Sequence, residues 1–197
     1  AKAQKGVIDN DSHTLVMFAD YYYALCASKL GQDNTELLFT RFIEAYHETT
    51  LRNRAYYELG SYYFRKNKMV NTVEWYEKVD TKDLTNDELI EFKFNFGYAY
   101  FKRKKFEQAK PLLKSIKDAK HSYSVPANYY YGFISFYQEN YKEAEKSFIK
   151  LENSKRYKEA VPYYLTQLYF LRKDYDLVIS YASPLLSNPR NENIMEI

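Results

Sequence analysis

The stretch AYYELGSYYF, residues 55–64, decides the fold of this chain. Its Tyr56, Gly60 and Tyr63 are spaced by four and three residues, so they lie on one stripe of a helix. A glycine inside a helix costs about 1 kcal/mol relative to alanine. It is tolerated where a neighbouring helix comes too close for a side chain. Tyr76 follows at a distance that predicts a second helix, which packs back on the first after a short turn.

The same arrangement recurs along the chain. Small residues in the position of Gly60 follow one another at intervals of 34, 37, 35 and 34 residues, namely Cys26, Gly60, Gly97, Gly132 and Thr166. Sixteen positions after each of them stand Phe42, Tyr76, Leu113, Phe148 and Ala182, of which all but the last are large. A period near 34 residues with this order of large and small positions is the signature of the tetratricopeptide repeat, TPR. The chain resembles the TPR family, which implies an all-α fold, a right-handed α-solenoid of about five helix-turn-helix repeats.

The resemblance predicts one continuous array over residues 1–197. The repeats are expected at about 15–50, 53–84, 85–122, 124–157 and 159–190, and residues 191–197 are interpreted as the start of a further first helix. The chain is therefore interpreted as a fragment of a longer repeat protein. Thr85 and Glu88 form a capping box that predicts where the first helix of the third repeat begins.

Composition agrees with a helical repeat array. Apolar residues make up 46% of the chain, enough for a continuous core, and aromatic residues reach the high value of 19%. A net charge of +3 is too small to imply nucleic acid or an anionic membrane as partner. No run of about twenty apolar residues suggests a transmembrane segment. The single cysteine, Cys26, excludes an internal disulfide, and its place in the repeat predicts a small buried residue rather than a reactive thiol.

The residue types that carry catalysis or bind metals are not grouped in the sequence. His13, His47 and His121 fall in the leading arm and in two joins between repeats, with no spacing that suggests a common ligand set. No glycine-rich phosphate loop and no Gly-x-Ser-x-Gly turn occurs. The acidic residues are expected on solvated helix faces. We therefore expect no catalytic residue, no metal site and no cofactor, and we do not expect an enzyme.

The TPR resemblance implies a binding groove, because the first helices of such repeats line the inner wall of the solenoid. At the inward positions the sequence is mostly aromatic. The predicted groove residues are Tyr23, Tyr57, Ser61, Phe64, Phe94, Tyr98, Phe101, Tyr129, Phe133, Phe136, Tyr163, Gln167 and Phe170. Aromatic side chains in such numbers are typical of interaction surfaces. The predicted function is a protein-protein interaction scaffold whose groove holds an extended or helical segment of another protein.

The alternative is that these rings only pack against one another. The chain would then be a rigid spacer or assembly module of a multidomain envelope protein, with no ligand in the groove. The sequence leaves the partner and the oligomeric state open. A carboxylate clamp of the kind that binds chaperone C-termini is not expected, since the inward positions lack the cations that such clamps use.

Residues 42–60 carry a more specific resemblance within the TPR family. The phrase from Phe42 through Tyr46 and Thr49 to Gly60 resembles the "F-x-x-x-Y-P-x-S … A-x-Y-x-L-G" phrase of bacterial cell-envelope TPR proteins of the TolA-binding and outer-membrane-assembly lipoprotein type. His47 stands where those proteins have proline. The resemblance implies a periplasmic or cell-envelope setting, with the cytoplasm as the alternative.

Basic residues gather between Lys102 and Lys120, where eight Lys or Arg stand against Glu107 and Asp118. One hypothesis is a basic outer ridge that meets an acidic protein, a lipid headgroup or RNA. The other is a solubilising convex face. Few aromatics are interleaved, so specific binding of nucleic acid is not expected.

Overall fold

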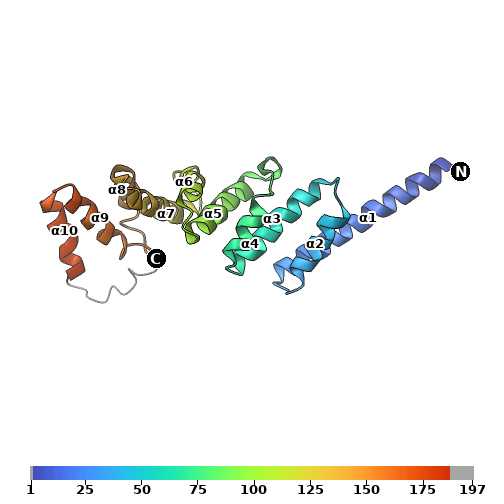
Figure 1. The fold of residues 1–197 in the computed structure, drawn as a ribbon, viewed down its shortest axis with the longest axis horizontal. Coiled ribbons are helices and arrows are strands. Elements are labelled where there is room, and N and C mark those ends of the chain that lie inside the picture. Colours follow the sequence, from blue (N-terminus) through green and yellow to red (C-terminus); the bar gives the residue numbers. More distant parts are fainter. Residues whose placement is uncertain (1, 187–197) are drawn as a thin grey trace. The chain divides into compact units, whose positions relative to one another are not determined.

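The computed structural model describes residues 2–186, with side chains from residue 12 onward. Over this range every regular element is helical and no strand occurs (Figure 1). The chain divides into two compact units, residues 1–104 and 105–197, which we describe separately.

Unit 1 is built from consecutive helices that pack on their neighbours in the chain. The pairs α1–α2 and α3–α4 form hairpins, and α3 also packs against α1, α2 and α5. Its elements are α1 (Lys2–Lys29), α2 (Thr35–Ala45), α3 (Thr50–Arg65), α4 (Met69–Tyr76), the 3-10 helix Thr81–Asp83 and α5 (Asn86–Lys102). The capping box predicted for Thr85 and Glu88 is confirmed at the start of α5. Thr49 caps α3 in a similar way, since its hydroxyl accepts from the backbone N–H of Leu51.

Unit 2 repeats the same plan. The pairs α7–α8 and α9–α10 are hairpins, and α7 and α9 each pack against the helix that precedes them. Its elements are α6 (Phe106–Lys114), α7 (Ser124–Tyr137), α8 (Tyr141–Ile149), α9 (Val161–Leu171) and α10 (Tyr175–Leu186). Pro162 stands in the first turn of α9, where its missing N–H leaves no helical hydrogen bond unmade.

The hairpin turns share one backbone geometry. One residue of each turn has a positive φ: Gly31 (68°), Asn67 (57°), Glu139 (60°) and Lys173 (64°). In the second hairpin the N–H of Asn67 donates to the carbonyl of Phe64, and the next N–H, of Lys68, donates to that of Tyr63, both at 2.9 Å. This pair of bonds is a Schellman motif, which ends a helix by satisfying its last carbonyls. The positive-φ residue therefore marks the same point in every hairpin.

The close approach predicted at Gly60 is confirmed. A Cβ built on Gly60 would lie 2.3 Å from Cδ1 of Tyr76, so the ring of α4 occupies the space that a side chain would need. Gly132 of α7 stands in the same relation to α8, with Phe148 at 3.0 Å. The two glycines permit the helix-to-helix contact on which each hairpin core is built.

In the first repeat the predicted register is wrong by two residues. Asn67 follows Gly60 by seven positions, and the turn residue Gly31 follows Ala24, not Cys26, by the same number. Ala24 is accordingly buried, whereas Cys26 is exposed. The prediction that Cys26 is a buried residue is therefore wrong, because the turn between α1 and α2 comes two residues earlier than the repeat period suggests.

Candidate functional site

The structure places the predicted groove residues of α3 at different depths. Tyr57 and Ser61 are buried in unit 1. Tyr57 stacks on Tyr76 with ring centroids 6.2 Å apart, and the Ser61 hydroxyl lies 2.8 Å from the Tyr76 hydroxyl. Phe64 is half-buried. Because α3 is covered by α1, α2, α4 and α5, Tyr57 and Ser61 contribute to the core and have almost no accessible surface.

A row of rings links the first helices α3 and α5 of unit 1. The Phe64 ring meets the Tyr98 ring edge-on at 5.7 Å, and Phe94 stacks on Tyr98 at 6.1 Å. All three side chains are half-buried, whereas Phe101 at the end of α5 is buried. The structure thus brings together three of the predicted groove residues on adjacent helices.

Tyr23 of α1 is exposed and lies apart from this row. In the corrected register the residue that corresponds to Tyr57 is Tyr21, which is buried and contacts Phe42 at 5.5 Å, as Tyr57 contacts Tyr76. The position of the turn glycine, Gly31, is the signal in the sequence that would have located it.

In unit 2 the predicted residues surround one tyrosine that the sequence analysis did not single out. Tyr164 of α9 is buried and stacks on Phe148 at 5.0 Å. Three half-buried groove residues, Phe133, Phe136 and Tyr163, contact its ring at 6.0, 5.7 and 5.6 Å. Burial raises the pKa of Tyr164 above its usual range. The Tyr164 ring thus belongs to the core, whereas the three groove residues around it keep some accessible surface.

A fourth groove residue, Tyr129, also touches this cluster. It contacts the Tyr164 ring at 6.4 Å and stacks on Tyr157 at 4.2 Å. Tyr157 lies in the segment between α8 and α9 and is buried. The inward face of α7 is therefore tied to the next hairpin by stacked rings.

The remaining two predicted residues, Gln167 and Phe170, lie beside an apolar cavity. A hollow of about 310 Å³ is lined by Thr166, Gln167, Phe170, Leu171 and Val178. Phe170 is 62% exposed and Leu171 is also exposed. Small apolar cavities with a few polar groups at the rim are typical of sites that hold a side chain of a partner. Phe170 and Tyr23 are the two predicted groove residues that are exposed.

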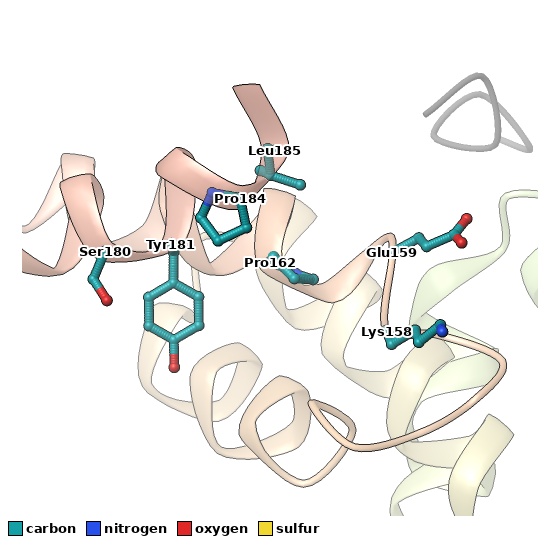
Figure 2. Close-up of a pocket in the computed structure, with 7 residues that line it drawn as sticks. All are labelled: Lys158, Glu159, Pro162, Ser180, Tyr181, Pro184 and Leu185. Atoms are coloured by element: carbon teal, nitrogen blue, oxygen red, sulfur yellow. The ribbon is translucent and has the colours of Figure 1, made fainter. Parts of the chain in front are cut away.

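A second cavity lies at the end of the same hairpin. It has a volume of about 370 Å³ and is lined by Lys158, Glu159, Pro162, Ser180, Tyr181, Pro184 and Leu185. Figure 2 shows Pro184 and Leu185 of α10 beside Pro162 at the start of α9, with Lys158 and Glu159 on the preceding segment. The Tyr181 hydroxyl donates to Glu152 Oε1, and this bond raises the pKa of Tyr181.

Ion pairs join the first two hairpins of unit 1 to the helices that follow them. Arg54 of α3 forms a bidentate salt bridge with Glu88 of α5, in which its two terminal guanidinium nitrogens donate to the two carboxylate oxygens at 2.8 and 2.6 Å. Lys29 at the end of α1 pairs with Glu58 of α3 at 3.0 Å. Glu58 is buried, so the expectation that acidic residues lie on solvated faces is wrong at this position. A buried carboxylate requires such a partner, since its desolvation is otherwise unfavourable.

The hydrogen bonds from Arg54, with those of the Thr85 cap, lower the pKa of Glu88 from 4.5 to about 2. A carboxyl group with a lowered folded-state pKa stabilises the fold above its unfolded pKa, and this contribution is lost as the pH falls towards 2. We expect Glu88→Gln to lower the free energy of unfolding by about 1–2 kcal/mol at pH 7, an amount reduced by partial exposure of the pair. The deficit should shrink by more than half at pH 3.

Urea unfolding at the two pH values, followed by the fluorescence of the single tryptophan, Trp75, measures this difference. Asp87→Asn is the control, since it removes an exposed charge from the same helical turn. A Glu88→Gln deficit that is unchanged between pH 7 and pH 3 would contradict the role of the Arg54 pair.

The basic cluster predicted between residues 102 and 120 is not uniformly exposed. Lys117 is buried, and its Nζ lies 2.9 Å from Asp118 Oδ2. Lys110 is half-buried and donates to Gln138 Oε1 at 2.7 Å. Lys117 therefore has a structural role and does not belong to a surface ridge.

Among the described residues no three His, Cys, Asp or Glu side chains lie close enough together to hold a metal ion. No helix within residues 2–186 combines the length and the apolar character needed to cross a lipid bilayer.

Solved structures of TPR-like proteins are similar to this chain in fold. A structure of MamA AMB-1 matches with a TM-score of 0.68 and 13% identity, over 90% of this chain and 94% of that one. PilF of Pseudomonas aeruginosa matches with a TM-score of 0.54 and 16% identity, over 86% and 75%. A putative kinesin light chain of Podosopora anserina with TPR-like repeats gives 0.54 and 15%, over 87% and 93%.

These comparisons confirm the predicted all-α, TPR-like fold. At identities of 13–16% they concern the fold alone. No protein-family model and no curated protein sequence matches the chain.

Proposed function

We propose that this chain is a protein-protein interaction scaffold that binds a segment of another protein along the inward faces of its first helices. The proposal treats the two units as one array of repeats. The observation that supports it most is the apolar hollow of about 310 Å³ beside Gln167 and Phe170. Both are inward positions of the repeat, and the Phe170 ring is open to solvent. An accessible ring beside a small cavity is the usual form of an anchor point in a protein interface.

The aromatic rows of each unit extend this surface. Phe64, Phe94 and Tyr98 remain half-buried in unit 1. Phe136 and Tyr163 remain half-buried in unit 2. Tyrosine and phenylalanine offer a large contact area at a small cost in side-chain entropy. A partner segment with apolar side chains at regular intervals, extended or helical, fits such a row.

A second candidate function is a rigid spacer or assembly module. The burial of Tyr57 and Ser61 favours it, because two of the inward positions of α3 are used for packing. On this reading the remaining rings also serve only to hold consecutive first helices together. The two functions differ in whether Phe170 contributes to binding.

Selection of random 16-residue peptides on the immobilised chain tests the proposal. We expect enriched peptides with spaced apolar residues, and we expect the double variant Gln167→Ala, Phe170→Ala to weaken their binding about tenfold, the effect of losing one aromatic anchor. Fluorescence anisotropy with a labelled peptide measures the dissociation constant. Tyr137→Ala is the control, since Tyr137 is exposed but does not occupy an inward position. Failure to enrich any peptide, or equal binding by the double variant, would favour the spacer.

A further inference from the structure

Each of the three first helices of unit 1 ends on a basic residue. Helix α1 ends at Lys29, α3 at Arg65 and α5 at Lys102, and all three residues are exposed. A basic residue in the last turn is favourable for any helix, because it lies at the negative end of the helix dipole. This interaction alone accounts for a cation at a helix end, so the contacts of each side chain decide whether it has a further role.

The three cations differ in their partners. Lys29 forms an ion pair with the buried Glu58 at 3.0 Å. Among the residues that the structure describes, no carboxylate forms an ion pair with Arg65 or Lys102. Helices α3 and α5 pack against each other. Two adjacent first helices therefore carry, at the same end, a positive charge that no ion pair compensates.

The guanidinium group of Arg65 is held in place by the end of α1. Its Nη2 donates to the carbonyl oxygen of Ser28 at 3.2 Å and to the Ser28 hydroxyl at 2.9 Å. Ser28 is buried, so this anchor is itself fixed. Both bonds use the same nitrogen, and the guanidinium fork has further N–H donors that can bind a carboxylate. Because the group is already oriented, it loses little entropy when it binds one.

Aromatic rings lie beside the two cations. Phe64 precedes Arg65 in α3, and its ring meets that of Tyr98 of α5 edge-on at 5.7 Å. Lys102 follows Tyr98 by one helical turn. Phe64 and Tyr98 are half-buried and keep some accessible surface. At the ends of α3 and α5, the row of rings in unit 1 is therefore bordered by positive charge.

The other end of this surface on α5 is negative. Glu91 precedes Tyr98 by seven residues, so it lies on the same stripe of α5, about 16 Å along the helix from Lys102. It is half-buried and accepts from Asn95 Nδ2 at 3.5 Å. Within the described residues no cation forms an ion pair with Glu91. An acidic group of a partner is attracted to the Lys102 end and repelled from the Glu91 end.

We propose that the surface formed by Phe64 and Tyr98, with Arg65 and Lys102 at its edge, binds an acidic segment of another protein in an extended conformation. The inference rests on the proposed scaffold function and adds the chemistry of the bound segment. One carboxylate binds the guanidinium fork of Arg65 with parallel hydrogen bonds, and a second binds the point charge of Lys102.

The spacing of an extended chain fits two neighbouring helices. Packed helices lie about 8–10 Å apart, and side chains on one edge of an extended segment repeat at about 7 Å. Acidic residues two positions apart therefore reach both Arg65 and Lys102. The residue between them points to the opposite edge, where an apolar side chain contacts Phe64 and Tyr98. The carboxylates belong to side chains within the segment, so the contact differs from a clamp on a C-terminal carboxylate.

Single-stranded nucleic acid also combines negative charge with groups that contact aromatic rings, but it fits this surface poorly. Stacking of bases needs an open ring face. Here Phe94 stacks on Tyr98 at 6.1 Å, and Phe64 meets Tyr98 edge-on. The carboxylate of Glu91 also repels a phosphate backbone that follows α5. The surface therefore favours a protein segment.

The peptide selection that tests the scaffold function tests this inference through the composition of the enriched peptides. We expect an excess of Asp and Glu two positions apart, beside apolar residues. The most enriched peptide is then labelled in two forms, one as selected and one with Asn and Gln in place of Asp and Glu, and fluorescence anisotropy gives both dissociation constants. We expect the amide form to bind about tenfold more weakly at about 50 mM salt, and the difference to shrink at about 500 mM.

Two variants of the chain locate the contact. Lys102→Gln removes a charge that has no ion-pair partner among the described residues, and we expect it to weaken binding of the acidic peptide about threefold. Arg65→Gln should weaken it about fivefold, since it also removes the guanidinium fork. Binding of the amide form should be unchanged in both, which separates lost charge from a folding defect. Lys82→Gln is the matched control, because it removes an exposed lysine of unit 1 from the 3-10 helix. Glu91→Gln should leave binding unchanged or strengthen it.

The possible failures are distinguishable. Failure to enrich any peptide would contradict the scaffold function and this inference with it. Enriched peptides without an excess of acidic residues, or equal effects of Lys102→Gln and Lys82→Gln, would overturn the inference and leave the scaffold function standing. Binding of a labelled oligo(dT) that Lys102→Gln weakens would overturn it in favour of nucleic acid.

Discussion

Gly60→Ala is expected to lower the free energy of unfolding of unit 1 by about 2 kcal/mol, the usual range for overpacking a core. The new Cβ would lie 2.3 Å from Cδ1 of Tyr76. That ring cannot move aside, because it meets Phe92 at 4.8 Å and Tyr57 at 6.2 Å and its hydroxyl is bonded to Ser61. In an exposed helix the same substitution would be stabilising by about 1 kcal/mol.

Urea unfolding followed by Trp75 fluorescence measures the change, since Trp75 lies in α4 and its ring stacks on Tyr56. The control is Gly132→Ala in unit 2, followed by hydrogen exchange of α7. Its Cβ would meet Phe148 at 3.0 Å, a contact that small shifts can relieve. We expect a cost below 1 kcal/mol there. A stabilised Gly60→Ala protein would show that α3 and α4 are not in close contact.

Tyr164→Ala is expected to have the largest effect, a loss of about 3–4 kcal/mol in the stability of unit 2, as is usual for removal of a buried aromatic ring. Tyr164 is almost fully buried and stacks on Phe148. Its ring also meets Phe133 and Phe136. The substitution leaves a cavity between two hairpins and removes the stacking contact of α9 with Phe148 of α8. Because neighbouring repeats stabilise each other through such contacts, the α9–α10 hairpin should open first.

Hydrogen exchange resolved by peptide is the suitable measurement, since it separates α9 and α10 from the rest of unit 2. Tyr164→Phe keeps the ring and should retain most of the stability. Tyr137→Ala removes an exposed ring and should change stability by less than 0.5 kcal/mol. If the amides of α9 and α10 in the Tyr164→Ala protein stayed as protected from exchange as the rest of unit 2, this would contradict a structural role for the Tyr164 ring between α8 and α9.

Local patterns were sufficient to predict the helices, the turns and one helix contact. Gly60 predicted a close approach of two helices because a glycine in a helix needs a reason, and Tyr76 indicated which helix approaches. Thr85 and Glu88 predicted a helix start because the capping box is made by residues only three apart. Each of these features depends on side chains that are near one another in the chain or at fixed helical offsets, so one sequence suffices to predict it.

The same reasoning from local patterns predicted less about the candidate site. Helical spacing places Tyr57, Phe94 and Phe170 on equivalent stripes but does not say what covers them. The structure shows Tyr57 in the core, Phe94 half-buried and Phe170 exposed, because the helices around each of them differ. Tyr164 was not selected because its importance comes from Phe148 of the preceding hairpin. Burial is a property of neighbours, and neighbours from other repeats leave no periodic signal in the helix that they cover.

The first repeat also shows which features the sequence determines and which depend on the tertiary structure. Small residues at a period near 34 were enough to establish the repeating hairpin and its order of helices. Only the folded chain decided that Ala24 rather than Cys26 is buried, since that depends on where the turn at Gly31 reverses the backbone. Only the folded chain revealed that Tyr22 and Tyr23 are uncovered, while their counterparts Glu58 and Leu59 are buried. The repeat pattern follows from the spacing of residues along the chain, whereas the exposure of a side chain depends on which helix packs against its face.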